Sequence, residues 1–233
     1  MTELAPRFSE PAEGYRKGVN PHRLDHLALY VADPPGVARN LLSRLPFRVI
    51  EETDEFLLVG RSPELGKLTL FRAPGPRERG SLVNVGIGIP CATASTTLVA
   101  GEGLDIELVP SAADGEVDIS HIALRVPDPV KSVRTWLAFG FERAGTVGPA
   151  ERVRLGSTYL VLHPGPVDEA RRPLLNHLGL LVESIDETRR VAANLGFEVE
   201  REVEGDESFA LFVCGPDGVE VEYIEHKPSF ALA

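Results

Sequence analysis

The feature that most constrains this chain is an eight-residue pattern that occurs four times. The copies are LDHLALYV from Leu24, LVNVGIGI from Leu82, ISHIALRV from Ile119 and LNHLGLLV from Leu175. Each runs apolar, any residue, His, apolar, Ala or Gly, apolar, any residue, Val or Ile, with Asn replacing His in the second copy. Such self-similarity predicts a chain built from repeated supersecondary units.

The segments after three of the octets also recur, each as a helix followed by extended stretches. Helix starts are indicated by an N-cap residue with Pro or a capping box behind it, at Asp33, Asp128 and Ser184. The helices are expected to stop at Pro46, Gly140 and Gly196. The second unit is short, since 37 positions separate Asn84 from His121 against 58 and 56 for the other intervals. We expect it to hold a strand, a helix over residues 91–103 and one more strand.

The sequence therefore predicts an α+β chain of four tandem βαβββ modules, the second abbreviated, grouped as two pairs. We expect residues 1–19 to form a flexible N-terminal arm. Residues 20–118 would form an N-terminal module pair without a metal site, and residues 119–233 a C-terminal pair that carries one.

Composition excludes several classes of partner. The formal net charge of −11 comes without a cluster of Lys or Arg, which opposes binding to nucleic acid. No apolar run approaches the roughly 18 residues of a membrane span, and the N-terminus lacks the apolar centre of a secretory signal. We expect a cytoplasmic protein whose partner is a small molecule.

His177 in the fourth octet is the first candidate for a chemical role. A single His in an apolar strand is more often a core residue than a ligand. However, the residue two positions further on is small in each His-containing copy, which leaves space beside the ring: Ala28, Ala123 and Gly179. Glu222, in the strand GVEVEYIEH, either faces water or is buried with a partner. His121, His177 and Glu222 together suit a facial triad for ferrous iron, and manganese or zinc fits the same donors.

These residues carry a family likeness over roughly residues 20–227. DHLALYV, SHIALRV and NHLGLLV, each followed by a helix, together with GPDGVEVE, resemble the vicinal oxygen chelate superfamily. That superfamily includes glyoxalase I, bleomycin-resistance proteins and extradiol dioxygenases. The resemblance implies two cup-shaped mixed-sheet domains and an enzyme that commonly forms homo-oligomers.

Four modules with ligands in the C-terminal pair most resemble the type I extradiol ring-cleaving dioxygenases. This likeness implies iron ligands at His121, His177 and Glu222, a catalytic acid/base at His163, and O2 as co-substrate. Two other roles for His163 stay open: a strand-end residue hydrogen-bonded to a loop, and a fourth metal ligand at the strand where glyoxalase I has a Glu. Phe212 stands where the family has a Tyr, and we expect it to line the substrate pocket with Gly179 and Ala123.

The other histidines are expected to be structural. His26 occupies the ligand position of the first module, but the second module has Asn84 there and the strand KLTLFRAPG lacks a carboxylate. We therefore expect His26 to be a core or loop-bonded residue, and His22 and His226 to be solvated.

Three functions are compatible with these patterns. The leading hypothesis is a metal-dependent dioxygenase that chelates two adjacent oxygens of a small aromatic or diol substrate and activates O2. One alternative is a glyoxalase-type isomerase or lyase, which consumes no oxygen. The other is a binding protein that sequesters a hydrophobic compound.

Overall fold

The computed structural model describes residues 18–112, 115–167 and 172–230. Most of the expected N-terminal arm, residues 1–17, lies outside the described residues. Of its last two positions, Val19 is buried, and its backbone N–H donates to the carbonyl of Ala138 at 3.2 Å. No helix in these described ranges is long and apolar enough to cross a membrane.

The first and second modules run from β1 to β7. The first contains β1 (Arg23–Val31), α1 (Pro34–Leu42), β2 (Arg48–Glu52), β3 (Phe56–Gly60) and β4 (Lys67–Arg72). The second contains β5 (Leu82–Pro90), β6 (Thr96–Gly101) and β7 (Leu104–Ser111). The expected helix over residues 91–103 is wrong, because β6 occupies this segment and pairs antiparallel with β7. The β-branched run Thr96–Thr97 and Val99 favours this strand.

The third and fourth modules have the full βαβββ order. The third contains β8 (Asp118–Val126), α2 (Pro129–Ala138), β9 (Glu142–Val147), β10 (Ala150–Leu155) and β11 (Thr158–Pro164). The fourth contains β12 (Leu175–Leu181), α3 (Ile185–Leu195), β13 (Val199–Glu204), β14 (Ser208–Cys214), the short 3-10 turn η1 (Pro216–Gly218) and β15 (Glu220–His226). The predicted N-caps are confirmed, since the side chains accept hydrogen bonds from the first turns at Asp33, Asp128 and Ser184.

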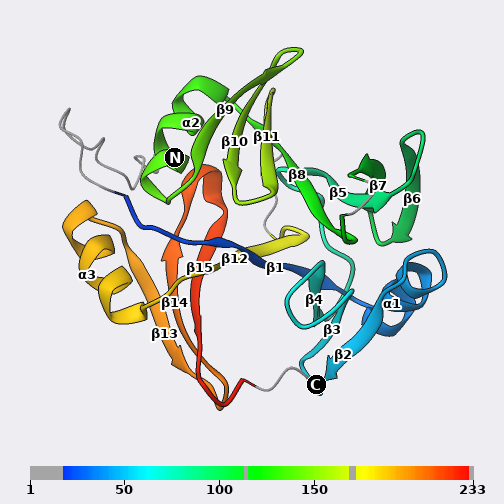
Figure 1. Cartoon of the computed structure of the whole chain (residues 1–233), viewed down its shortest axis with the longest axis horizontal. Coiled ribbons are helices and arrows are strands. Elements are labelled where there is room, and N and C mark those ends of the chain that lie inside the picture. The colour runs from blue at the N-terminus through cyan, green and yellow to red at the C-terminus, as the bar shows by residue number, and fades with distance from the viewer. Residues whose placement is uncertain (1–17, 113–114, 168–171, 231–233) are drawn as a thin grey trace.

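The strands form two mixed sheets, which confirms the predicted α+β class (Figure 1). One sheet has the order β13-β14-β15-β12-β1-β4-β3-β2 and the other β6-β7-β5-β8-β11-β10-β9. The first module thus pairs with the fourth, and the second with the third. The sheets do not follow the expected division at residues 118 and 119, because β1 pairs antiparallel with β12 and β5 with β8.

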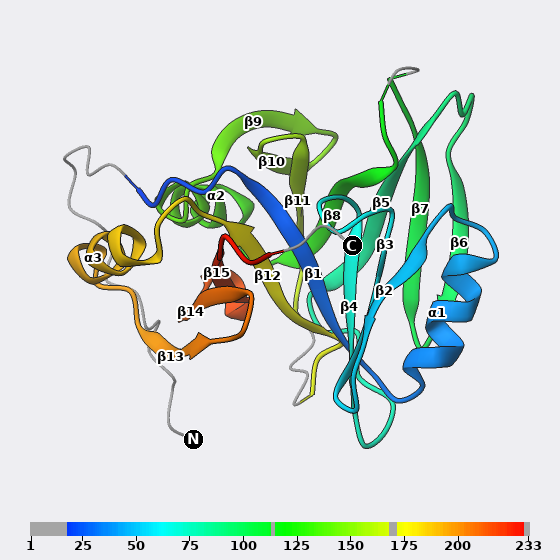
Figure 2. The same ribbon diagram turned by 60° about the horizontal axis from the view of Figure 1, so that its bottom comes forward.

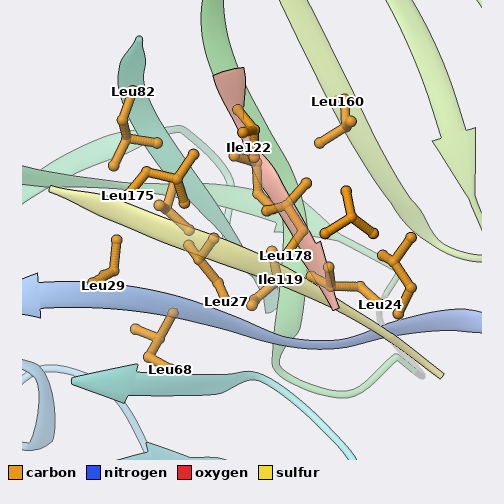
Figure 3. Packing of buried hydrophobic residues seen from close by; sticks show 14 of the residues in the cluster. Leu24, Leu27, Leu29, Leu68, Leu82, Ile119, Ile122, Leu160, Leu175 and Leu178 are labelled. Atoms are coloured by element: carbon orange, nitrogen blue, oxygen red, sulfur yellow. The ribbon is translucent and has the colours of Figure 1, made fainter. Parts of the chain in front are cut away.

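One hydrophobic core joins the two sheets. Along β1 and β12, Leu27, Leu29, Leu178 and Leu180 are fully buried. Figure 3 shows Leu27 and Leu178 gathered with Ile119 and Ile122 of β8 in one cluster. Helix α1 packs against β6 of the other sheet as well as against β3 and β4 (Figure 2). Because side chains alternate along a strand, the residues between these leucines face the other side of each sheet.

Candidate metal centre

Three potential metal ligands meet on the eight-stranded sheet: His26 of β1, His177 of β12 and Glu222 of β15. The two Nε2 atoms of His26 and His177 lie 3.0 Å apart. Oε2 of Glu222 lies 3.0 Å from each of them. All three side chains are largely buried. Among the His, Cys, Asp and Glu residues in the described part of the chain, these three have ligand atoms close enough together to hold one metal ion.

The equal spacing has a simple meaning for coordination. Imidazole and carboxylate ligands bind first-row metals at about 2.1 Å, so neighbouring ligands of an octahedral ion lie about 3.0 Å apart. The three atoms therefore match one triangular face of such an octahedron. Two imidazoles and one carboxylate on one face leave the opposite positions for other ligands.

Strand register brings the three side chains together. His26 is opposite Gly179 across the β1–β12 pair, and Gly179 is opposite Glu222 across the β12–β15 pair. A Cβ on Gly179 would lie 2.3 Å from Cε1 of His26. The missing side chain at Gly179 therefore lets the His26 ring lie over β12 and reach Glu222 on the next strand.

A buried carboxylate orients His26 from behind. Oδ2 of Asp25 lies 2.9 Å from Nδ1 of His26, and it accepts a hydrogen bond from Nζ of Lys67 at 2.7 Å. Oδ1 of Asp25 lies 3.2 Å from Nε2 of His226. The register of β1 shifts between Leu24 and His26, and such an irregularity re-aims side chains. With Nδ1 donating to Asp25, the Nε2 lone pair of His26 is free for a metal.

Electrostatics favours an ionised cluster. Burial opposes a charged His26, but Glu222 and Asp25 outweigh it and raise the pKa of His26 to about 9. Burial also opposes a charged Glu222, but His26 and His177 outweigh it and lower its pKa to about 2. Burial lowers the pKa of His177 despite Glu222, so this ring is neutral at pH 7. An ion bound here would replace one proton.

Aromatic side chains surround His177. The ring of Phe212 is 5.3 Å from the His177 ring in an edge-on arrangement, and Phe71 is 6.1 Å away. The guanidinium of Arg201 lies 3.6 Å from the Phe212 ring and donates to Glu220. Nδ1 of His177 is buried with no hydrogen-bond partner among the described residues, so packing holds this ring. Phe212 and Gly179, two expected pocket residues, thus lie beside the triad.

The structure differs from the expected ligand set at one position. His177 and Glu222 lie together as expected, but the third potential ligand beside them is His26. His121 is on β8 of the other sheet, where its Nε2 lies 3.5 Å from Oε2 of Glu107. Burial lowers the pKa of His121 despite Glu107. His26, expected to be a core or loop-bonded residue, occupies the same octet position as His121. The two histidines lie in different surroundings because β1 pairs antiparallel with β12, whereas β8 pairs with β5.

The remaining expected site residues lie away from the triad. His163 is on β11 of the seven-stranded sheet, half-buried and opposite Arg125, and Ala123 is opposite Asn84. His226 is not solvated as expected, because it contacts Asp25 and stacks on Phe230 at 4.0 Å. The sequence pattern did not predict the roles of Asp25 and Lys67 behind His26. A signal for Asp25 was its position in the buried octet, where a charged residue needs partners.

Comparisons with known proteins identify the fold. No protein-family model matches the chain, and no curated protein matches its sequence. Among solved structures, a putative dioxygenase from Bacillus subtilis is similar with a TM-score of 0.72 and 16% identity, covering 92% of this chain and 88% of that one. Glyoxalase I from Zea mays has a TM-score of 0.69 and 14% identity, covering 87% and 92%. The cppA protein from Streptococcus pneumoniae has a TM-score of 0.56 and 15% identity, covering 88% and 100%.

The two mixed sheets of repeated strand units and the likeness to these structures lead to one conclusion: the chain has the vicinal oxygen chelate fold.

Proposed function

We propose that this protein is a metal-dependent enzyme that binds a divalent ion through His26, His177 and Glu222 and acts on a small substrate with two adjacent oxygens. The observation that carries the proposal is the triangle of ligand atoms at 3.0 Å. A bound divalent ion would polarise the two substrate oxygens as a Lewis acid, and ferrous iron would in addition bind O2. Iron(II) is the favoured ion, with manganese(II) and zinc(II) as alternatives.

The surroundings of the triad suit an aromatic or other flat substrate. Phe71 and Phe212 flank His177 with apolar rings, of which Phe71 is the more exposed, since Arg201 lies over the Phe212 ring. Asp25 holds the Nδ1 proton of His26 and keeps the ring aimed at the ion. Glu222 balances part of the charge of the ion. These side chains position the reacting atoms and exclude water from one side of the site.

The leading activity is an oxygen-consuming, extradiol-type dioxygenase reaction. Three protein ligands leave three positions of an octahedral ion, enough for a bidentate diol and O2. A fourth protein ligand would come from β4, at the position equivalent to Glu222 on β15. That position is Thr69, opposite Ala28, and it offers no carboxylate or imidazole. The solved dioxygenase-like neighbour agrees with this choice as an analogy of fold.

A glyoxalase-type isomerase or lyase is the second candidate. Phe71 occupies on β4 the position that His163 occupies on β11, as judged from the parallel registers of β1 with β4 and β8 with β11. The triad therefore lacks a proton-shuttling imidazole at that place. A glyoxalase-type reaction also moves a proton, but the Glu222 carboxylate would serve as its base, so it needs no further imidazole and consumes no oxygen.

Oxygen uptake separates the two candidates. Protein prepared anaerobically is loaded with Fe(II), mixed with a panel of catechols and aliphatic diols or α-hydroxy ketones, and followed with an oxygen electrode and by product analysis. The proposed reaction predicts uptake of one O2 per substrate consumed. Turnover without uptake would support the isomerase or lyase instead.

Two matched variants connect the activity to the triad. His26→Ala is expected to lose both bound iron and turnover. His22→Ala, which removes an exposed histidine four positions earlier in the chain, is expected to retain them. Tight substrate binding that persists in His26→Ala and in excess chelator would contradict an enzyme and indicate a ligand-sequestering protein.

A further inference from the structure

The two sheets repeat the same local arrangement around their central strands. In the eight-stranded sheet, Glu222, Gly179 and His26 lie in one row across β15, β12 and β1. In the seven-stranded sheet, Glu107, Gly86 and His121 lie in one row across β7, β5 and β8. In each row the strand with the glycine runs parallel to the strand with the glutamate and antiparallel to the strand with the histidine. The positions therefore correspond one to one.

The glycine has the same steric role in the second row. A Cβ on Gly86 would lie 2.1 Å from Nδ1 and Cε1 of His121. The His121 ring therefore lies over β5 and points at Glu107, as the His26 ring lies over β12 and points at Glu222. Nε2 of His121 and Oε2 of Glu107 are 3.5 Å apart.

Asn84 takes the position that His177 has in the triad, two residues before the glycine. Nδ2 of Asn84 lies 3.3 Å from Oε2 of Glu107. Oδ1 of Asn84 is buried and has no hydrogen-bond partner among the described residues. Such an oxygen is costly to leave unpaired. A half-turn of the amide about its terminal bond exchanges the two atoms and brings Oδ1 beside Oε2 of Glu107, an arrangement that only a bound cation would stabilise.

We propose that His121, Glu107 and Asn84 form a second, weaker binding site for a divalent metal ion. The ligand set is an imidazole nitrogen, a carboxylate oxygen and an amide oxygen. The spacings of 3.3 and 3.5 Å bracket the roughly 3.4 Å between ligands of a tetrahedral ion with bonds of about 2.1 Å.

The second site is expected to bind more weakly than the triad for two reasons. The amide oxygen of Asn84 is a poorer ligand for transition metals than the imidazole of His177. The Glu107 side chain is also 34% exposed against 9% for Glu222, so water competes for it. This inference concerns a separate site and holds whichever reaction the triad performs.

Cobalt(II) titration of the full chain tests the second site. The visible absorption of bound cobalt and the stoichiometry by calorimetry are followed under anaerobic conditions. We expect the wild type to bind two equivalents with distinct affinities. His121→Ala and Glu107→Gln are expected to lose the weaker equivalent and keep the tighter one, whose retention shows that these variants are folded.

Asn84→His supplies the gain-of-function arm. It restores the two-imidazole, one-carboxylate set and is expected to tighten the weaker equivalent at least tenfold, leaving the tighter one unchanged. A wild type that binds a single equivalent, lost in His26→Ala and unaffected by His121→Ala and Asn84→His, would overturn the second site and leave the proposed function intact. A wild type that binds a single equivalent, lost in His121→Ala and unaffected by His26→Ala, would contradict the proposed function and leave the second site intact.

Discussion

At the scale of single residues, the account depends on Gly179 as much as on the ligands. The His26 ring occupies the space where a side chain of Gly179 would be, and this overlap carries Nε2 to within 3.0 Å of Glu222. A ligand position that lies across a neighbouring strand needs such a gap, because adjacent strands are only about 4.8 Å apart.

Gly179→Ala should therefore damage the metal site more than the fold. The added methyl pushes the His26 ring away from Glu222, and we expect the affinity of the tight site for cobalt(II) to fall at least tenfold. Gly86→Ala is the matched control, because it makes the same change beside His121 in the other sheet. Equal losses from the tight site in both variants would contradict the assignment of His26.

The raised pKa of His26 makes metal binding depend on pH. Since the pKa of His26 is about 9 in the folded protein, the ion must displace a proton at neutral pH. We expect affinity to rise by up to about tenfold per pH unit from pH 7 and to level off near pH 9. Competition with a chelator of known pH dependence measures this rise, and an affinity that stays constant over this range would contradict it.

The raised pKa of His26 has the opposite effect on the stability of the metal-free protein, which falls as the pH rises. Its folded pKa lies above the value of about 6.5 for an unperturbed imidazole, so the charged His26 stabilises the fold fully below pH 6.5. That contribution is lost as the pH rises from 6.5 through about 9. Glu222, whose pKa is lowered to about 2, stabilises the fold above pH 4.5 and loses this effect in acid.

At the scale of elements, local signals in the sequence predicted most strands and helices. Asp33, Asp128 and Ser184 cap their helices because a short polar side chain satisfies a free N–H of the first turn. The helix predicted over residues 91–103 was wrong, because antiparallel pairing with β7 decides the conformation of this segment. The octet position of a candidate ligand could be predicted from the sequence. The strand that pairs with each octet could not.

The turn η1 connects the fourth module to α2 through Asp217. Its carboxylate accepts hydrogen bonds from Ser132 at 2.7 Å and from the buried Trp136 indole at 3.2 Å. Asp217 also has a φ of 57°, a conformation that glycine and asparagine adopt most easily.

Substitutions at Asp217 separate the two contributions. Asp217→Gly keeps the backbone conformation and removes both hydrogen bonds, so we expect a loss of about 1–3 kcal/mol in the free energy of unfolding. Asp217→Asn keeps the shape and one acceptor and should lose less. Denaturant unfolding measures both, and a neutral Asp217→Gly would show that the link between η1 and α2 contributes little.

At the scale of the whole molecule, the first and last modules share one sheet, so the candidate site combines residues 196 positions apart in the chain, His26 and Glu222. Sequence order favoured pairing of neighbouring modules, and that is why His121 was expected in place of His26. The choice between these pairings depends on how the complete sheets pack on one another, which no single octet records.

This topology predicts that the chain cannot be divided at residue 118. A fragment of residues 119–233 keeps His177 and Glu222 but exposes the edge of β12 that β1 covers, and we expect it to be poorly folded and to bind metal at least a hundredfold more weakly. Circular dichroism and metal titration of the monomeric fragment test this, with coexpressed residues 1–118 as the rescue. A folded fragment with native affinity would support the division at residue 118.

The central claim is that His26, His177 and Glu222 hold one divalent ion. Anomalous diffraction from crystals grown with Fe(II) under anaerobic conditions, or with Zn(II), tests it directly. We expect the strongest anomalous peak within about 2.0–2.3 Å of Nε2 of His26, Nε2 of His177 and a carboxylate oxygen of Glu222. A strongest peak at His121 and Glu107, with none at the triad, would contradict the claim.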